Sequence, residues 1–422
     1  MIDFTRTLDP QASLARAFHL VPPDGADRPL WQGLVELAWD QDDSALAGRT
    51  LAPEVVGACG VARGDVVVRA AGEAVERYAL RPLPADRAAW PELPGERLDF
   101  AAPGAGLGAP GAPVAAYYPA RRLSDGARVL VPAGLVDYPA EEHPGFDPSP
   151  SGAASGDGLD MALRAALLEV IERDAVLVAW ARRLALPRVD LDGSLRGAPN
   201  GPGWRRLAAA LRVARDGGVE PVLARIPTGV PGVFCAVGVV LDEHEGRPLA
   251  AVGCNAAGDW GTTLAGALQE ALQIRSLLRL TQRAHPDVPA PELVTGDVER
   301  ARYFADRPGA DAAAAWCAGF TGPEPVGGET PPGPPGVRQL VEGLAGQGVQ
   351  PLAVELTHRL PPELRAMGWA AVKVVPVGLQ PLRMDERAAF GWNLTRLESA
   401  PRRTGFEALD RGGPAWAPHP LI

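Results

Sequence analysis

The chain has 422 residues and a formal net charge of −10 at pH 7, which argues against nucleic acid as its main partner because nucleic-acid-binding surfaces are basic. Hydrophobic residues make up 46% of it, enough for the core of one large α/β domain or of two to three smaller ones. No run of about eighteen uncharged apolar residues occurs, so the sequence predicts no membrane span.

The N-terminus and the cysteines indicate a cytoplasmic protein. Residues 1–6 contain neither a basic stretch nor the start of an apolar one, so we expect no secretion signal. The four cysteines, Cys59, Cys235, Cys254 and Cys317, are widely spaced and have no histidine cluster nearby. We therefore expect reduced, mostly buried thiols and neither a zinc site nor a set of disulfides.

The first two thirds of the chain alternate strand-like runs with two helical segments. In chain order these are strands at 34–39 and 65–68, a helix at 71–80, strands at 129–131 and 134–138, a helix at 160–180, and strands at 221–226, 233–241 and 248–254. Residues 100–115, rich in Ala, Gly and Pro, and residues 149–158, rich in Ser and Gly, are expected to be loops. Residues 242–246 are typical of a hairpin turn between two of the later strands.

The last third of the chain begins with a third long helix. Its expected elements are a helix at 262–280, a strand at 350–356, a short helix at 361–367 and a strand at 370–376, the last three forming a β-α-β-like unit. Thr262 or Thr263 is a suitable N-cap for the long helix. Residues 285–335 are rich in Pro, Asp and Gly and predict a peripheral insertion or long loop. The proline-rich end, residues 414–422, is expected to be extended because proline denies it helix or central-strand structure.

The three long helices carry one repeated pattern: a carboxylate, a second carboxylate or an amide three positions later, and an arginine close behind. Its members are Glu73, Glu76 and Arg77 in the first helix, Glu169, Glu172 and Arg173 in the second, and Glu270, Gln273 and Arg275 in the third. Residues three apart share one helix face, so each copy presents two oxygen ligands side by side. The neighbouring residues are apolar or small, which indicates packed helices in which a charge needs a partner.

A single copy of this pattern is more typical of a solvated helix face with an internal salt bridge. Three copies about one hundred residues apart, each among apolar residues, instead predict one shared site. Clustered carboxylates suit a hard cation, and guanidinium groups suit phosphate.

No standard nucleotide-binding loop is present in the sequence. Lys373 is the only lysine, and it stands in the strand-like run 371–375 and not after a glycine-rich turn, as a P-loop requires. The glycine-rich segments 103–108 and 327–328 lack the strand-then-helix context of a dinucleotide-binding fold. If the chain uses ATP, it does so through a nonstandard site.

Taken in order, these motifs resemble those of the YcaO family, whose members are ATP-dependent enzymes that activate backbone amides in ribosomally made peptides. The resemblance runs from about residue 55 to the end of the chain. Besides the helix motifs, it rests on the loop 151–156, the run Glu-Val-Ile-Glu-Arg-Asp-Ala at 169–175, the segments 372–376 and 378–381, and residues 391–397. It implies a mixed α/β fold with one large catalytic domain over 55–422, preceded by a poorly matched segment, 1–54. The three motif helices would converge on a cavity for ATP and Mg²⁺.

The resemblance also implies roles for the motif residues. The ligands of Mg²⁺ would be Glu73, Glu76, Glu169, Glu172 and Glu270, and the contacts to ATP would come from Arg77, Arg173, Gln273 and Arg275. Two positions depart from the family pattern: Arg69 stands where a small polar residue is common, and Met161 stands where an acidic residue often precedes Ala162. These departures concern the nucleoside side of the site and leave the metal helices intact.

The reaction implied by the resemblance is cyclodehydration. The side chain of a Cys, Ser or Thr adds to the preceding peptide carbonyl, ATP phosphorylates the resulting oxygen, and loss of phosphate gives a thiazoline or oxazoline, with ADP as the second product. Two alternatives stay open: a standalone enzyme that forms a macrolactamidine or a thioamide, and a non-catalytic docking scaffold. Retention of five clustered glutamates argues against the scaffold.

The end of the chain bears on the choice among these reactions. Azoline-forming members commonly end in alternating prolines that reach the active site, and Pro418 and Pro420 keep part of this pattern while Ile422 takes the last proline position. We expect Pro418 and Pro420 to belong to a functional, catalytic tail, because Trp416 and the terminal apolar residues are costly to leave in water. The alternative is a disordered terminus.

The expected partners follow from the same resemblance. One is a ribosomally synthesised precursor peptide, and another is a leader-binding adaptor of the E1-like (ThiF-type) kind, because no segment here resembles a peptide-capturing module. A homodimer is one option for the assembly. Neither nucleic acid nor a membrane is expected.

Overall fold

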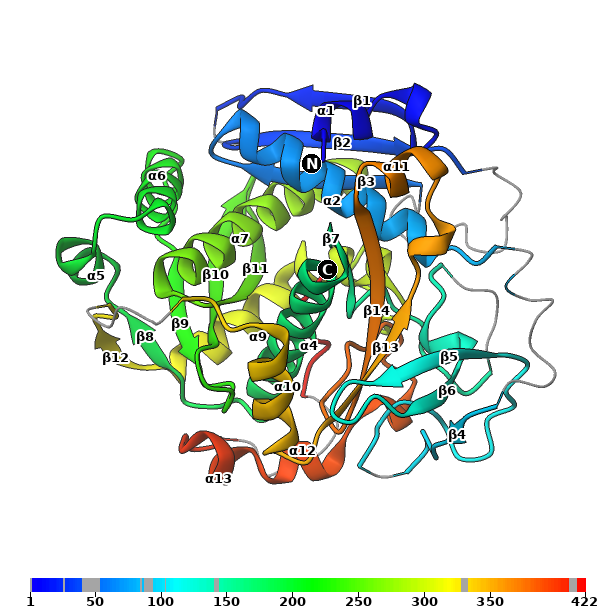
Figure 1. The fold of residues 1–422 in the computed structure, drawn as a ribbon. Helices are drawn as coiled ribbons and strands as arrows, with labels where there is room; N and C mark the ends of the chain where they lie inside the picture. Colours follow the sequence, from blue (N-terminus) through cyan, green and yellow to red (C-terminus); the bar gives the residue numbers. More distant parts are fainter. Residues whose placement is uncertain are drawn as a thin grey trace.

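The computed structural model describes residues 2–25, 27–39, 54–83, 86, 94–102, 104–139, 144–327, 333–409 and 416–422. Within these ranges the strands form three sheets, and the long helices pack against and between them (Figure 1). The combination of helices with mixed sheets confirms the predicted α/β class.

The N-terminal sheet has three antiparallel strands and supports the first motif helix. Its strands are β1 (Ala15–Val21), β2 (Trp31–Leu37) and β3 (Val55–Gly60). β3 leads directly into α2 (Arg63–Leu80), which packs against this sheet. The sequence suggested a domain boundary after residue 54. β1 and β2 lie before this boundary and β3 lies after it, yet all three strands share one sheet. The boundary itself stays a prediction.

The second sheet has five strands and presents β11 at its edge. Its order is β11 (Arg247–Ala257), β10 (Phe234–His244), β9 (Val222–Ile226), β8 (Pro187–Val189) and β12 (Thr321–Glu324). The three predicted strands of this region are confirmed. The hairpin turn is shorter than expected: Glu245 and Gly246 both have positive φ, and the ladder runs on to the pair His244 and Arg247, as in a two-residue primed turn.

The third sheet has six strands. Its order is β4 (Glu96–Arg97), β6 (Arg128–Pro132), β5 (Tyr117–Arg122), β13 (Gln350–Glu355), β14 (Trp369–Val377) and β7 (Ala153–Asp157). The predicted strands at 350–356 and 370–376 are confirmed as β13 and β14, but they pair antiparallel. The connection, which holds α11 (Pro362–Ala366), is therefore a hairpin connection and not a parallel crossover.

The second and third motif helices are α4 (Leu159–Ala181) and α7 (Trp260–Ala284). α4 is apolar on most of its circumference, so it is stable only when buried on all sides, and it lies between the five-stranded and six-stranded sheets (Figure 1). α7 crosses β10 and β11 at close range, since a Cβ on Gly253 would lie 2.3 Å from the amide nitrogen of Ala271. Its N-cap is Asp259, which accepts from the amide of Thr262, so the expected cap at Thr262 or Thr263 is wrong.

The remaining helices in the described ranges are shorter. They are α1 (Phe4–Thr7), α5 (Leu191–Gly197), α6 (Pro202–Asp216), α8 (Asp297–Phe304), α9 (Arg307–Ala318), α10 (Val337–Ala345), α12 (Leu394–Glu398) and α13 (Ala400–Thr404). No helix in these ranges combines the length and the apolar character needed to cross a bilayer.

Four local predictions are wrong. Residues 65–68 lie in α2, where an Ala-rich continuation outweighs the strand preference of three valines. Residues 133–135 form a 3₁₀ turn in place of part of the strand expected at 134–138, and the loop expected at 149–158 contains β7, which pairs with β14. Of the two structures expected for residues 285–335, the long loop is wrong, since the segment contains α8, α9 and β12, with Asp306 as the cap of α9 and a proline in its first turn. The peripheral insertion stays a prediction.

Gly152 tests how the six-stranded sheet meets α4. Its φ is +85°, and a Cβ there would lie 2.3 Å from the carbonyl oxygen of Val374 and 3.0 Å from Val170 Cγ1. Gly152→Ala should therefore lower the free energy of unfolding by at least about 3 kcal/mol, measured by urea denaturation. Gly126→Ala is the matched control, with φ +76° and nothing within 4 Å, and should cost only about 1–2 kcal/mol. Equal losses in both variants would contradict the steric argument.

Candidate active site

Two of the predicted ligands are held by the free edge of β11. Because β11 is the outermost strand of its sheet, alternate amides on its outer side have no strand partner. The amide of Ala256 donates to Glu172 Oε2 at 2.7 Å, and the amide of Cys254 donates to Glu270 Oε2 at 2.5 Å. Carboxylates from α4 and α7 therefore meet at one strand edge, as the sequence predicted.

Arg173 joins the carboxylates of the second motif. Its guanidinium lies 2.8 Å from Glu172 Oε1 and 3.6 Å from Glu169 Oε1, and it donates to Cys254 Sγ at 2.9 Å. Burial, reinforced by the negative charges of Glu270 and Glu169, nevertheless raises the pKa of Glu172 to about 7. Burial and the neighbouring carboxylates thus outweigh the effect of Arg173 on the pKa of Glu172.

The first motif completes the carboxylate cluster from α2. Arg77 pairs with Glu73 at 3.1 Å, and its guanidinium lies 5.4 Å from the centre of the Tyr138 ring. Burial and the negative charges of Glu73 and Glu169 raise the pKa of Glu76 well above its usual range. The charge of Glu169 on α4 acts on Glu76, so these carboxylates of α2 and α4 lie within electrostatic range of each other.

Lys373 closes the cluster from β14 and was not among the predicted site residues. Its Nζ donates to the carbonyls of Ser149 (2.7 Å) and Ser151 (2.5 Å). Burial lowers the pKa of Lys373 to about 8, although the charges of Glu169 and Glu76 oppose this shift. The sequence did hold a signal: the only lysine of the chain stands within an apolar strand, where an ammonium group needs negative partners.

A pocket lies beside Lys373 and contains further residues that the sequence analysis missed. Its polar lining includes Asp147, Ser149, Ser151, Arg173, Lys373 and Gln380. Burial raises the pKa of Asp147 to about 6, even though its carboxylate accepts from the amides of Met384 and Asp385. No motif marks Asp147, because the contacts that define its position come from a distant segment of the chain.

The two other predicted nucleotide contacts on α7 have different surroundings. Gln273 faces β3, since a Cβ on Gly57 would lie 4.0 Å from its Nε2. Arg275 is buried, and its Nε donates to Asp242 Oδ2 at 2.8 Å, a carboxylate that Arg279 also contacts. Contact of Gln273 and Arg275 with a nucleotide stays a prediction.

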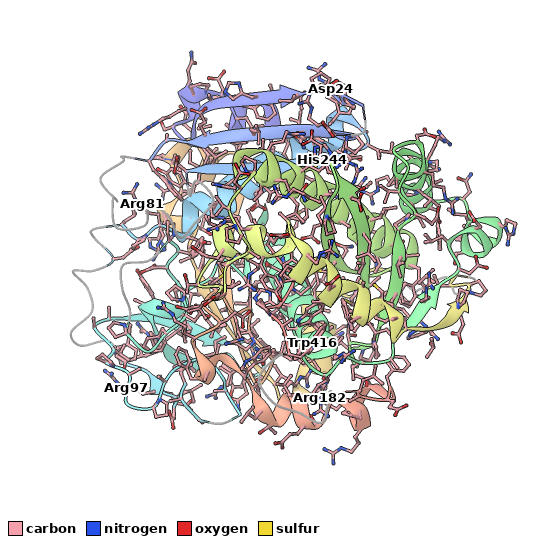
Figure 2. All side chains as sticks on the ribbon, turned by 180° about the vertical axis from the view of Figure 1, so that it is seen from behind. Asp24, Arg81, Arg97, Arg182, His244 and Trp416 are labelled. Carbon is pink, nitrogen blue, oxygen red and sulfur yellow. The ribbon has the colours of Figure 1, made fainter. Side chains whose placement is uncertain are left out.

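The C-terminal segment 416–422 packs along α4. Trp416, labelled in Figure 2, stacks on Trp180 with 4.8 Å between ring centres and donates to the carbonyl of Trp180. Arg300 of α8 donates to the carbonyl of His419 at 2.8 Å. Burial and the nearby charge of Arg300, with a smaller contribution from Arg173, lower the pKa of His419 well below its usual range. The segment is therefore held against the end of α4 and by α8, with His419 within range of the charge of Arg173.

Within this tail, Pro418 is half-buried and Pro420 is buried. The described part of the tail contains neither helix nor strand, and residues 416 and 417 form a bend; an extended backbone stays a prediction. Participation of Pro418 and Pro420 in the chemistry stays a prediction.

A buried cluster of glutamates and arginines, built from three helices of an α/β fold, defines an enzyme that handles cations and phosphate. The family profile described as YcaO cyclodehydratase, ATP- and Mg²⁺-binding, matches residues 67–380. The chain therefore belongs to the YcaO family of ATP-dependent cyclodehydratases, with ATP and Mg²⁺ as cofactors. None of the curated proteins matches the chain.

Solved structures share its fold. The YcaO protein of Methanopyrus kandleri, bound with AMPPCP and Mg²⁺, has a TM-score of 0.58 and 19% identity over 88% of this chain and 87% of that one. A heterocyclase in complex with substrate and cofactor has a TM-score of 0.65 and 18% identity over 97% of this chain, which spans only 55% of that protein. The E. coli microcin synthetase McbBCD complex with pro-MccB17 bound gives 0.55 and 12%, over 85% and 86%.

The residues present fit magnesium and a nucleotide. Burial and mutual repulsion raise the pKa of Glu76, Glu169 and Glu172, so a divalent cation would relieve the repulsion among them. Among the residues that the structure describes, no three His, Cys, Asp or Glu side chains are placed to hold one metal ion. The guanidinium groups of Arg77 and Arg173 lie among the carboxylates instead.

Glu172 gives a pH-dependent test. Its pKa is about 7 in the folded chain against 4.5 when unperturbed, so its contribution to stability is present below about pH 4.5 and is lost as pH rises through about 7. With EDTA present, the free energy of unfolding of the wild type should fall between about pH 5 and about pH 8, and Glu172→Gln should reduce this fall by up to about 3 kcal/mol. Urea unfolding at the two pH values measures it. Glu172→Gln should also abolish ATP turnover. Glu342→Gln, on the exposed face of α10, is the control and should keep the pH dependence of the wild type. If Glu172→Gln is as pH-sensitive as the wild type, the assignment of the raised pKa to Glu172 is contradicted.

Arg300 tests what holds the tail. Its side chain is fully buried and donates to the carbonyls of His419, Arg383 and Met384 while pairing with Glu386. Arg300→Met should increase hydrogen exchange and carboxypeptidase cleavage of residues 416–422 by at least about tenfold. Arg302→Met, on the same helix with one contact to the carbonyl of Pro289, should change neither. Unchanged protection of the tail in Arg300→Met would show that the packing of Trp416 holds it alone.

Proposed function

We propose that this chain forms thiazoline or oxazoline rings from Cys, Ser or Thr residues of a ribosomally made precursor peptide, with ATP converted to ADP and phosphate. The observation that carries the proposal is the meeting of Glu172 from α4 and Glu270 from α7 at the edge of β11, with Glu76 of α2 within range of the charge of Glu169 and with the C-terminal segment packed on α4. A cluster of this charge suits a metal-bound phosphate chain.

The chain's own residues supply positioning and charge. Glu73, Glu76, Glu169, Glu172 and Glu270 would hold Mg²⁺. When bound, ATP and Mg²⁺ supply the phosphoryl group that makes the amide oxygen a leaving group, and they neutralise its developing charge. Arg173 and Lys373 line the adjacent pocket, where they would orient the carbonyl oxygen of the reacting peptide bond. Burial of this pocket would limit attack by water on the activated amide.

The tail supports azoline formation over the macrolactamidine and thioamide alternatives. Its residues are packed against α4 and reach the range of the Arg173 charge, as expected of a segment that contributes to the site. Pro418 and Pro420 would fix its backbone there, because proline restricts φ and lowers the entropy lost on ordering.

The partner of the peptide leader is also part of the proposal. The E. coli McbBCD complex, with which this chain shares its fold, is a synthetase complex with pro-MccB17 bound. By analogy we infer an adaptor, of the E1-like kind expected from the sequence, that raises the effective concentration of a flexible precursor at the site. A homodimer stays a prediction.

Mass spectrometry and kinetics test the reaction. Incubated with the precursor encoded beside its gene, the adaptor, Mg²⁺ and ATP, the chain should remove one water per ring and release one ADP per ring. Glu172→Gln with the same partners is the inactive control. A product in which sulfur replaces oxygen, or a macrocycle, would overturn azoline formation. Full-speed processing by the chain alone, with a micromolar KM, would overturn the adaptor.

A further inference from the structure

The pocket beside Lys373 contains a carboxylate that the proposed chemistry does not yet use. Among the described residues that line this pocket, Asp147 carries the negative charge, and Arg173 and Lys373 carry the positive charges. Apolar side chains, such as those of Leu107 and Val170, form much of the remaining wall. A carboxylate in such a pocket is a candidate for a role in the reaction, because withdrawing its charge from water is costly.

Backbone amides hold Asp147 in a fixed position. The amide of Met384 donates to Asp147 Oδ2 at 2.8 Å, and the amide nitrogen of Asp385 lies 3.2 Å from Oδ1 and 3.3 Å from Oδ2. The same segment is held from its carbonyl side, since Arg300 donates to the carbonyls of Arg383 and Met384. A carboxylate has about four acceptor sites, so these bonds orient the group and still leave it able to accept a proton.

The other polar side chains of the pocket are poorer proton acceptors. At neutral pH Lys373 is an ammonium group without an acceptor site, and it donates to the carbonyls of Ser149 and Ser151. Gln380 uses both ends of its amide group for backbone hydrogen bonds. The guanidinium of Arg173 stays protonated, and serine hydroxyls are weak bases. The carboxylate is therefore the best proton acceptor in the lining.

Charged groups from several elements act on Asp147. Burial raises its pKa to about 6, and Asp385 acts in the same direction, while the two backbone hydrogen bonds and Arg383 oppose the shift. A general base is most effective when its pKa lies near the working pH, and this value meets that condition. The titratable and charged groups around Asp147 are Tyr138, Arg173, Lys373, Arg383 and Asp385.

We propose that Asp147 is the general base that accepts the proton of the attacking thiol or hydroxyl of the substrate. This assignment rests on the proposed function, because it names a residue for the first step of ring formation. As the bond from sulfur or oxygen to the carbonyl carbon forms, the π electron pair of the carbonyl moves to its oxygen, and the S–H or O–H proton moves to a carboxylate oxygen of Asp147. The negative charge then lies on the former carbonyl oxygen, where Arg173 and Lys373 of the same pocket would stabilise it.

Precursors with different nucleophiles test the assignment. The precursor of the assay above is used with either Ser or Cys at one modified position. In Asp147→Asn, ring formation at Ser should slow at least about hundredfold. Ring formation at Cys should slow less, because a thiol, with a pKa of about 8.5, ionises far more readily than an alcohol. Raising the pH to about 9 should restore most of the Cys rate, since the thiolate then forms without a base.

The pH profile distinguishes a base from a carboxylate with a structural role. With saturating Mg²⁺ and ATP, kcat/KM of the wild type for the precursor should fall as the pH drops below about 6, because Asp147 becomes protonated. This fall should be absent in Asp147→Asn. In Asp147→Ala, added formate should restore part of the rate, because it can fill the space left by the side chain and accept the proton. Chloride at the same ionic strength should not.

Asp9→Asn is the matched control. The exposed Asp9 also accepts from a backbone amide, that of Gln11 at 2.8 Å, but it lies outside the pocket. This variant should process both precursors like the wild type. Binding of AMPPCP with Mg²⁺, measured by calorimetry, should be unchanged in both Asp147 variants if their fold and nucleotide site are intact.

The outcomes separate the base from the proposed function. Wild-type rates in Asp147→Asn with both precursors would overturn the base alone. Equal losses with the Ser and Cys precursors, an unchanged fall below about pH 6 and no effect of formate would also overturn it, and would leave Asp147 as a residue that positions the segment 384–385. Failure of the wild type to form azoline rings would overturn the proposed function and the base with it.

Discussion

The glutamates of α2, α4 and α7 repel one another, and the structure keeps them together by surrounding them with fixed donors. The edge amides of β11 hold Glu172 and Glu270, Arg173 spans Glu169 and Glu172, and Arg77 holds Glu73. Even so, the pKa of Glu172 stays near 7. Burial and the repulsion between these carboxylates are what a bound divalent cation would relieve, in line with the function proposed above.

This arrangement depends on where α4 lies. A helix that is apolar on most of its surface must be enclosed, and here the five-stranded and six-stranded sheets enclose it (Figure 1). The interruption in that apolar surface is the polar stretch that begins at Glu169. Enclosure by β11 on one side and β14 on the other brings Cys254 and Lys373 to the same stretch. The packing that forms the core around α4 therefore also positions the residues of the candidate site.

α8, within residues 285–335, and the C-terminal segment 416–422 are also held together by a buried charged side chain. Arg300 of α8 is buried because it holds three backbone carbonyls and Glu386 together. One of these carbonyls belongs to His419, so a segment that composition alone marks as peripheral holds the end of the chain. The position of the tail thus depends on the charge and hydrogen bonds of α8, a helix that is distant in the sequence.

The sequence alone determined the three motif helices, the family, and which carboxylates gather, because helical spacing and apolar neighbours are local properties of the chain. It also determined the strands of the central hairpin. It failed at 65–68, where the Ala-rich continuation of α2 outweighs the strand preference of the valines, and at 149–158, where pairing with the distant β14 makes a strand of an expected loop. Only the tertiary structure decided that Lys373 and Asp147 border the site and that Arg275 faces Asp242. These contacts join residues that are far apart in the chain, so no local sequence pattern predicts them.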